Sequence, residues 1–287
     1  MFHELQIFEN PEAILLVASI IFFFSIIAGK AGFRFGLPAL LLFLGVGMLF
    51  GSDGLGIQFS NPSAAQFIGM LALSIILFSG GMDTKMSEIK PIATEGVVLA
   101  TVGVLLTTLI TGGFIYYVFL WSTGYETLTV AESMLMAAVM SSTDSASVFS
   151  ILRSKGVYLK QRLRPTLELE SGSNDPMAYM LTLLIIAYIQ VGGMNLQEAV
   201  LQLLVQLSVG AIAGFLLGKL AVLMINKINM DNESLYPILL LTTAFFTFSA
   251  TTLCKGNGYL AVYIAGLVVG NAKIVHKKSM GTFFDGF

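Results

Sequence analysis

Long apolar runs, separated by short polar segments, recur along the whole chain. Most of these runs reach or approach the roughly 20 residues that an α-helix needs to cross the hydrocarbon core of a bilayer. We expect nine spans and the start of a tenth near Thr282; the nine lie at residues 11–29, 36–52, 64–81, 92–121, 131–151, 164–190, 197–226, 235–254 and 258–275. The pattern predicts an all-α polytopic membrane protein, with residues 1–287 forming one transmembrane domain.

The composition excludes an ordinary soluble domain. Hydrophobic residues make up 56% of the chain and only 11% of residues are charged, whereas about a quarter are charged in typical soluble domains. The net charge of −2 gives no indication of nucleic-acid binding, and we expect none. One cysteine, Cys254, allows no internal disulfide, and together with His3 and His276 it cannot build a metal cluster. We expect no cofactor.

Basic residues fall in alternate loops. Of the 15 Lys and Arg residues, all except Lys219 and Lys255 lie in or beside the loops that follow the odd-numbered spans. The positive-inside rule makes these loops cytoplasmic and places the N-terminus outside. We therefore expect a multi-pass protein in the lipid bilayer of the cell (inner) membrane.

The sixth span carries a polar cluster inside apolar sequence. Residues 168–176 read Glu-Leu-Glu-Ser-Gly-Ser-Asn-Asp-Pro. An ionised side chain at the bilayer centre costs about 2.5–3.5 kcal/mol on insertion scales, so such residues mark ion pathways or binding sites. Pro176 has no N–H to donate to the carbonyl of Gly172, which leaves a backbone oxygen one turn from the Asp175 carboxylate. A carboxylate with loosened carbonyls can replace the water shell of a small cation, and Asp175 is the candidate for this role.

A second polar patch lies near the middle of the fifth span, where residues 141–147 read Ser-Ser-Thr-Asp-Ser-Ala-Ser. Serine and threonine hydroxyls can bond their own backbone, so this patch is a candidate helix break. Asp144 would then either cap a resumed half-helix, where it balances the helix dipole, or act as an ion ligand. At about 100° per residue, one half of the sixth helix, which can face this patch, collects Glu168, Glu170, Ser171, Asn174 and Asp175.

The two glutamates of the sixth span have different alternatives. Glu168 lies one turn from Arg164 near the cytoplasmic end, and we expect an ion pair between them rather than a cation ligand. Glu170 is either a ligand or the partner of a cationic side chain on another helix. Both interpretations of Glu170 remain open at this point.

Glycines recur where helices can pack closely. Gly210, Gly214 and Gly218 form a double small-xxx-small ridge, which predicts a helix contact or a dimer face. Similar sets occur in the second and ninth spans: Gly45, Gly47 and Gly51, then Gly266 and Gly270. Residues 36–39 (Gly-Leu-Pro-Ala) and 258–261 (Gly-Tyr-Leu-Ala) open these two spans alike. Because the two spans are seven apart, a true repeat would be inverted, as in many secondary transporters.

Thr143-Asp144, followed by Glu-Ser-Gly-Ser-Asn-Asp-Pro at residues 170–176, resembles the paired motif of the monovalent cation/proton antiporter family, in its NhaP branch. The resemblance covers essentially the whole chain, including the Gly-Leu-Pro opening of the second span. Family members usually have more spans, so the chain resembles the N-terminal two-thirds of their membrane domain. The resemblance implies an antiporter-type inverted-repeat helical bundle with broken helices and an incomplete second repeat.

The resemblance also implies a role for each motif residue. Asp175 would be the essential carboxylate that binds cation or proton, while Thr143 offers its backbone oxygen and Ser171 its hydroxyl. Asn174 would tie the broken helices together, and Asp144 would compensate the half-helix ends. Glu170 would pair with an arginine on a later helix. The candidate cation- and proton-binding residues are thus Asp175, Ser171, Thr143 and Glu170, and those that shape the site are Asn174, Asp144 and Pro176.

On this basis we expect a secondary active transporter that exchanges a monovalent cation for protons at one carboxylate by alternating access. Burial disfavours the charged form of a carboxylate, so cation and proton would compete for Asp175. Relatives that exchange two protons carry a second acid where Asn174 stands, which implies electroneutral exchange here. The motif is most similar to that of bacterial potassium/proton antiporters, so potassium is favoured and sodium comes next. We expect a homodimer.

Other classes fit less well. An intramembrane aspartyl protease needs two buried aspartates, as Asp144 and Asp175 could be, but it also needs Gly-x-Gly-Asp where residues 172–175 read Gly-Ser-Asn-Asp. A serine hydrolase lacks a buried histidine here, so we expect no enzyme. A channel or a sensor subunit is an alternative, but channels build filters from symmetric rings, whereas this cluster is asymmetric. A proton-coupled organic-solute transporter would need a larger polar cavity.

Overall fold

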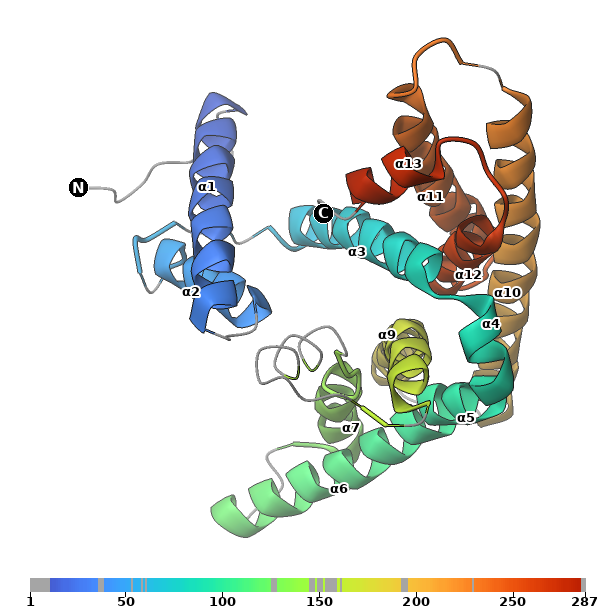
Figure 1. Cartoon of the computed structure of the whole chain (residues 1–287). Helices are drawn as coiled ribbons and strands as arrows, with labels where there is room; N and C mark the ends of the chain where they lie inside the picture. The colour runs from blue at the N-terminus through green and yellow to red at the C-terminus, as the bar shows by residue number, and fades with distance from the viewer. Residues whose placement is uncertain are drawn as a thin grey trace. The chain divides into compact units, whose positions relative to one another are not determined.

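The computed structural model describes residues 11–35, 39–52, 54–57, 59, 61–124, 128–144, 148, 152, 159–160, 162–191, 196–228 and 230–284 (Figure 1). Within these residues all regular structure is helical, as the sequence predicts, and no β-strand occurs. The chain divides into two compact units. The first comprises residues 1–67 with 144–160, and the second comprises residues 68–143 with 161–287.

The first unit contains two packed helices, α1 (Pro11–Phe35) and α2 (Ala39–Phe50). They correspond to the first two predicted spans, but α1 continues to Phe35 rather than ending at residue 29. The opening of the second span, residues 36–38, lies outside the described residues. A Cβ added at Gly45 or Gly47 would meet no described atom within 4 Å. Among the described residues of the first unit, no other helix packs closely against these two glycines.

The second unit contains most of the remaining helices. The helices are α3 (Pro62–Asp83), α4 (Met86–Ile89), a 3-10 turn (Lys90–Ile92), α5 (Ala93–Val98), a π-helical turn (Leu99–Gly103), α6 (Val104–Thr123), α7 (Val130–Val139), α9 (Leu163–Val191), α10 (Leu196–Lys227), α11 (Leu235–Leu253), α12 (Gly258–Asn271) and α13 (Lys277–Phe284). The first six residues of α3, 62–67, belong to the first unit. Among the described residues five helices are long and apolar enough to cross a membrane: Glu12–Lys30, Pro62–Asp83, Met86–Thr123, Gln197–Lys227 and Leu235–Leu253.

Helix α7 ends where the sequence predicts a break. It begins with a capping box, in which Thr129 and Glu132 bond each other's backbone N–H groups, and it ends at Val139. Residues 141–144 have no regular structure, so the predicted span 131–151 is not one continuous helix. The Ser141 hydroxyl donates to the carbonyl of Ala138 at 2.7 Å, the local competition with helix geometry that serine favours. The rest of the polar patch, residues 145–147, lies outside the described residues.

Two boundaries in the last part of the described chain also differ from those predicted. Helix α12 ends at Asn271 rather than at residue 275, because Ala272 is already extended, with φ −85° and ψ 158°. Helix α13 begins at Lys277, before the start near Thr282 that hydropathy predicts. Its first residues are basic and polar, so a hydropathy pattern places the start too late.

Helix α12 forms the core of one group of helices, together with α10, α11 and the end of α3 (Figure 1). The predicted glycine ridge of α10 lies against it. A Cβ added at Gly214 would lie 2.4 Å from the carbonyl oxygen of Ala261. Helix α12 meets α3 as closely, because a Cβ added at Gly270 would lie 2.1 Å from the carbonyl oxygen of Met82. These glycines confirm the predicted helix contact, and larger residues would push the backbones apart.

Helix α9 belongs to a second group. It packs on α5, on the π-helical turn and on α7, and it also contacts α12. Met177, Ala178 and Leu181 of α9 are buried in one cluster with Val104 and Ala138. This packing places the middle of α9, which carries the polar motif, beside the point where α7 stops.

Candidate cation site

The segment after α7 and the middle of α9 bring their polar side chains together. Ser142 and Thr143 come from the non-helical residues 141–144, and their partners come from residues 170–175 of α9. Helix α9 continues through Pro176, which removes one main-chain donor from its interior. The site therefore joins the end of α7 to a continuous helix that contains a proline.

Asn174 is the centre of a hydrogen-bond network and is fully buried, with 0% exposure. Its Nδ2 lies 2.6 Å from Thr143 Oγ1 and 2.8 Å from Glu170 Oε1. Thr143 Oγ1 in turn lies 3.0 Å from both carboxylate oxygens of Glu170. The threonine hydroxyl can thus accept from Asn174 while it donates to Glu170. The network fixes the α7 end against α9 through three side chains.

Ser171 adds a bond to the same segment. Its hydroxyl donates to the carbonyl oxygen of Thr143 at 3.0 Å, and the Asn174 amide approaches this oxygen to 3.4 Å. The backbone oxygen that the family resemblance assigns to the cation therefore accepts bonds from the protein itself. The structure brings four predicted residues, Thr143, Glu170, Ser171 and Asn174, into one polar cluster.

Asp175 has different surroundings from its neighbour Asn174. Its Oδ1 accepts a hydrogen bond from the hydroxyl of Ser142, and the same hydroxyl lies 3.2 Å from Asn174 Oδ1. Asp175 lines an open cavity of about 300 Å³, whose other lining residues are all neutral: Leu73, Ala138, Val139, Ser142, Ala178, Tyr179 and Thr182. A water molecule occupies about 30 Å³, so a cation that keeps part of its hydration shell would fit.

Ser142 is a site residue that the sequence does not single out. The sequence signal is the serine-rich patch as a whole, which contains four serines with no local difference between them. Only the end of α7 at Val139 and the position of α9 decide which hydroxyl reaches Asp175. The other acid of the patch, Asp144, is the last residue described before residues 145–147. Whether Asp144 caps a half-helix stays a prediction.

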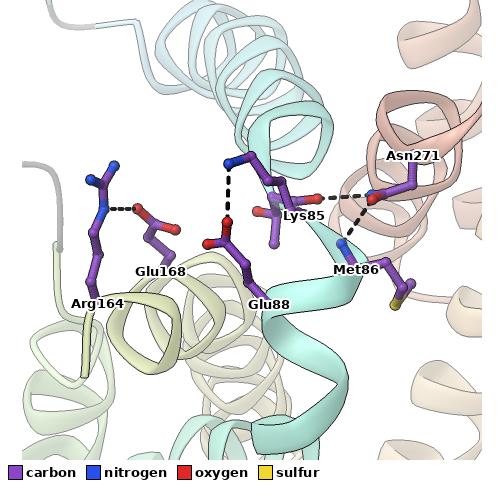
Figure 2. Close-up of polar contacts among 7 residues, drawn as sticks. Lys85, Met86, Glu88, Arg164, Glu168 and Asn271 are labelled. Carbon is purple, nitrogen blue, oxygen red and sulfur yellow. Dashed lines mark hydrogen bonds and ion pairs between the residues drawn. The ribbon is translucent and has the colours of Figure 1, made fainter. Parts of the chain in front are cut away.

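The predicted pair of Arg164 and Glu168 is present near the start of α9, as Figure 2 shows. Arg164 Nε lies 2.9 Å from Glu168 Oε1, and 71% of the arginine side chain is exposed. Figure 2 also shows a second exposed pair between Lys85, the residue before α4, and Glu88 on α4, with 3.0 Å between Nζ and Oε1. Both pairs lie within one turn of a helix, so they brace single helices rather than joining two.

Asn271, at the end of α12, holds the junction between α3 and α4 (Figure 2). Its Nδ2 donates to the carbonyl oxygen of Thr84 at 2.8 Å, and its Oδ1 accepts from the N–H of Met86 at 2.7 Å. The amide therefore satisfies backbone groups on both sides of the break between these helices. No local pattern in the sequence indicates this long-range contact.

The sequence matches the family of the sodium/hydrogen exchanger, transmembrane, over residues 12–287. It is 38% identical to the K(+)/H(+) antiporter NhaP of Alkalimonas amylolytica, over 93% of this chain and 45% of the relative. It is 35% identical to the K(+)/H(+) antiporter NhaP2 of Shewanella sp. (strain ANA-3), over 97% of this chain and 47% of the relative. The chain thus spans about half the length of these curated relatives. As predicted, they are antiporters and not enzymes.

The fold is similar to that of a solved antiporter. The structure of the sodium proton antiporter MjNhaP1 from Methanocaldococcus jannaschii at pH 8 superposes with a TM-score of 0.76 and 23% sequence identity, over 95% of this chain and 66% of that one. This match confirms the predicted helical antiporter fold. Together with the sequence match over nearly all residues, it shows that the chain belongs to the sodium/hydrogen exchanger family, a family of multi-pass membrane proteins.

Proposed function

We propose that the protein exchanges a monovalent cation for protons at Asp175 by alternating access. The observation that carries the proposal is the open cavity of about 300 Å³, in which Asp175 is the one acid among neutral lining residues. A carboxylate in such a place can hold either a proton or a cation, and each displaces the other. This competition couples the two fluxes without a separate proton pathway.

The neighbouring polar cluster supports different roles for Asn174 and Asp175. Asn174 cannot release a proton, and its amide is already bonded to Thr143 and Glu170. Asp175 is then the single exchanging carboxylate. One proton would leave for each monovalent cation that binds, so the exchange would be electroneutral. The hydroxyl of Ser142 would help to hold Asp175 in the cavity.

Potassium is the proposed cation, with sodium next. Two relatives named as K(+)/H(+) antiporters share 38% and 35% identity with the chain. A relative named as a probable Na(+)/H(+) antiporter, from Methanocaldococcus jannaschii, shares 28%. The basic loops support a place in the cell membrane with the N-terminus outside. A homodimer is part of the same proposal.

The test uses everted vesicles from antiporter-deficient cells that contain the full-length protein. An imposed proton gradient quenches acridine orange, and potassium, sodium and lithium are added in turn. We expect dequenching with potassium, and none in the Asp175→Asn variant, which keeps the size of the side chain but loses its charge. Glu198→Gln is the matched control, because this acid is exposed in the first turn of α10 and lies outside the cavity lining. It should exchange as the wild type does.

Two results would contradict the proposal. One is the absence of dequenching by the wild type with every cation at neutral and mildly alkaline pH, although the protein is present in the membrane. The other is full, pH-dependent exchange by Asp175→Asn. Stronger dequenching with sodium than with potassium would still support exchange at Asp175, but with sodium as the preferred cation.

A further inference from the structure

Asn257, the residue before α12, bonds with two other helices as well as with its own. Its Oδ1 accepts from the N–H of Leu260 at 3.0 Å and so caps α12. Its Nδ2 donates to the carbonyl oxygen of Pro176 on α9 at 3.0 Å. Its backbone N–H donates to the carbonyl oxygen of Gln206 on α10, also at 3.0 Å. The residue is only 4% exposed, so these bonds form away from water.

The bond to Pro176 reaches the carbonyl group of the residue directly after Asp175. Because Pro176 has no N–H, the main-chain bond that would hold residues 172 and 176 together is missing. This turn, which carries Ser173, Asn174 and Asp175, is therefore held less firmly by its own backbone than the rest of α9. A bond from outside the helix compensates for this loss, and Asn257 supplies one at the end of the turn.

Helix α12 also contacts the other end of the same turn. A Cβ added at Gly172 would lie 2.6 Å from Cε2 of Tyr263, so the glycine lets the buried tyrosine ring approach the α9 backbone closely. One turn back on α12, Tyr259 packs edge-on against Tyr179, with 4.7 Å between ring centroids. Tyr179 lines the cavity beside Asp175. Helix α12 thus contacts both ends of the proline turn and one wall of the cavity.

We infer that Asn257 is a positioning residue for the cation site, which holds the Asp175 turn of α9 against α12 in addition to capping α12. The inference rests on the proposed function. Helix α12 contributes no residue to the cavity lining. On this inference it determines the position of the Asp175 carboxylate through Asn257. The cap and the bond to Pro176 use different atoms of one amide, so they can be separated by substitution.

Asn257→Ser separates the two roles. Serine is a good N-cap, so it can keep the bond to Leu260, but it has no amide that reaches Pro176. We expect the apparent KM for potassium to rise about fivefold, as the loss of one net hydrogen bond implies. The maximal rate and the melting temperature in detergent should stay near those of the wild type. Asn257→Ala, which loses both bonds, should also lower the melting temperature.

The matched control is Asn226→Ser. Asn226 also makes two amide bonds to the chain around α12, donating to the carbonyl oxygen of Lys273 at 2.9 Å and accepting from the N–H of Val275 at 3.2 Å. Neither bond involves α9. We expect its apparent KM to equal that of the wild type. If Asn257→Ser does not fold, Asn257→Thr also offers a capping hydroxyl and lacks the amide donor, and it should raise the KM in the same way.

The outcomes separate the inference from the proposed function. One set of results would overturn the inference and leave the proposed function standing. In it the wild type exchanges, Asp175→Asn does not, and Asn257→Ser has an unchanged KM. An equal rise in KM in Asn226→Ser would also overturn it, because general loosening of α12 would then explain the effect. If the wild type shows no exchange, or if Asp175→Asn does exchange, the proposed function is instead rejected.

Discussion

Asn174 and Asp175 are neighbours on α9 with opposite surroundings. Asn174 is fully buried, and its amide is bonded to Thr143 and Glu170. Asp175 lines an open cavity and accepts from the hydroxyl of Ser142. One step along the helix rotates the side chain by about 100°, which is enough to move it from a buried position to the wall of the cavity.

This difference separates a structural polar group from an exchangeable one. The Asn174 amide is buried and bonded, so a loss of its bonds removes a structural contact between α9 and the end of α7. A carboxylate at the wall of a cavity can gain or lose a proton or a cation without disturbing that contact. We therefore expect substitutions at the two positions to act on different quantities: stability at Asn174 and exchange at Asp175.

The strongest test of this comparison is Asn174→Ala. The substitution removes the donor from Thr143 and Glu170 and leaves a charged group without one of its bonds. We expect the protein to lose about 2 kcal/mol of stability, because hydrogen bonds to charged groups contribute about 1.5–3 kcal/mol, and this loss should appear as a lower melting temperature in detergent. Asp175→Asn is the control and should melt as the wild type does. If Asn174→Ala melts at the wild-type temperature, the network is not structural.

Much of this site can be predicted from the sequence because its partners are close within one helix or carry unusual chemistry. Arg164 and Glu168 are four residues apart, so a helix brings them together. Asp175 stands out as an acid in an apolar span, and the serine-rich patch predicts the break after α7. The α10 glycine ridge predicts a close helix contact, and the structure shows that contact at Gly214.

The rest depends on contacts between distant segments. Asn257 and Pro176 are 81 residues apart, and neither position carries a pattern that pairs them. Ser142 is one of several serines, and only the docking of α9 selects it. A hydropathy pattern does not predict the start of α13, because the first residues of this helix are polar. Local periodicity finds helices and unusual residues, whereas helix docking decides which of these residues meet.

A smaller effect is expected from Ser142→Ala. The variant removes one hydroxyl from the cavity wall and with it the bond to Asp175, but it adds no bulk. We expect the apparent KM for potassium to rise about fivefold, with an unchanged melting temperature, because a single hydrogen bond is lost at a wet surface. Ser141→Ala is the matched control, since that hydroxyl donates to the carbonyl oxygen of Ala138 and not to Asp175. Equal KM values in both serine variants would show that Asp175 does not depend on Ser142.

The smallest effect is expected at the Arg164–Glu168 pair. Substitutions there test whether an acid of α9 other than Asp175 takes part in exchange. Arg164 is mostly exposed, and exposed ion pairs contribute about 0.2–1 kcal/mol. We expect Arg164→Gln, Glu168→Gln and the double variant to show a coupling energy within that range in melting experiments, and exchange close to that of the wild type. A loss of exchange in Glu168→Gln as complete as that in Asp175→Asn would mean that a second carboxylate of α9 takes part in transport. The contrast between one exchangeable acid and its structural neighbours would then no longer hold.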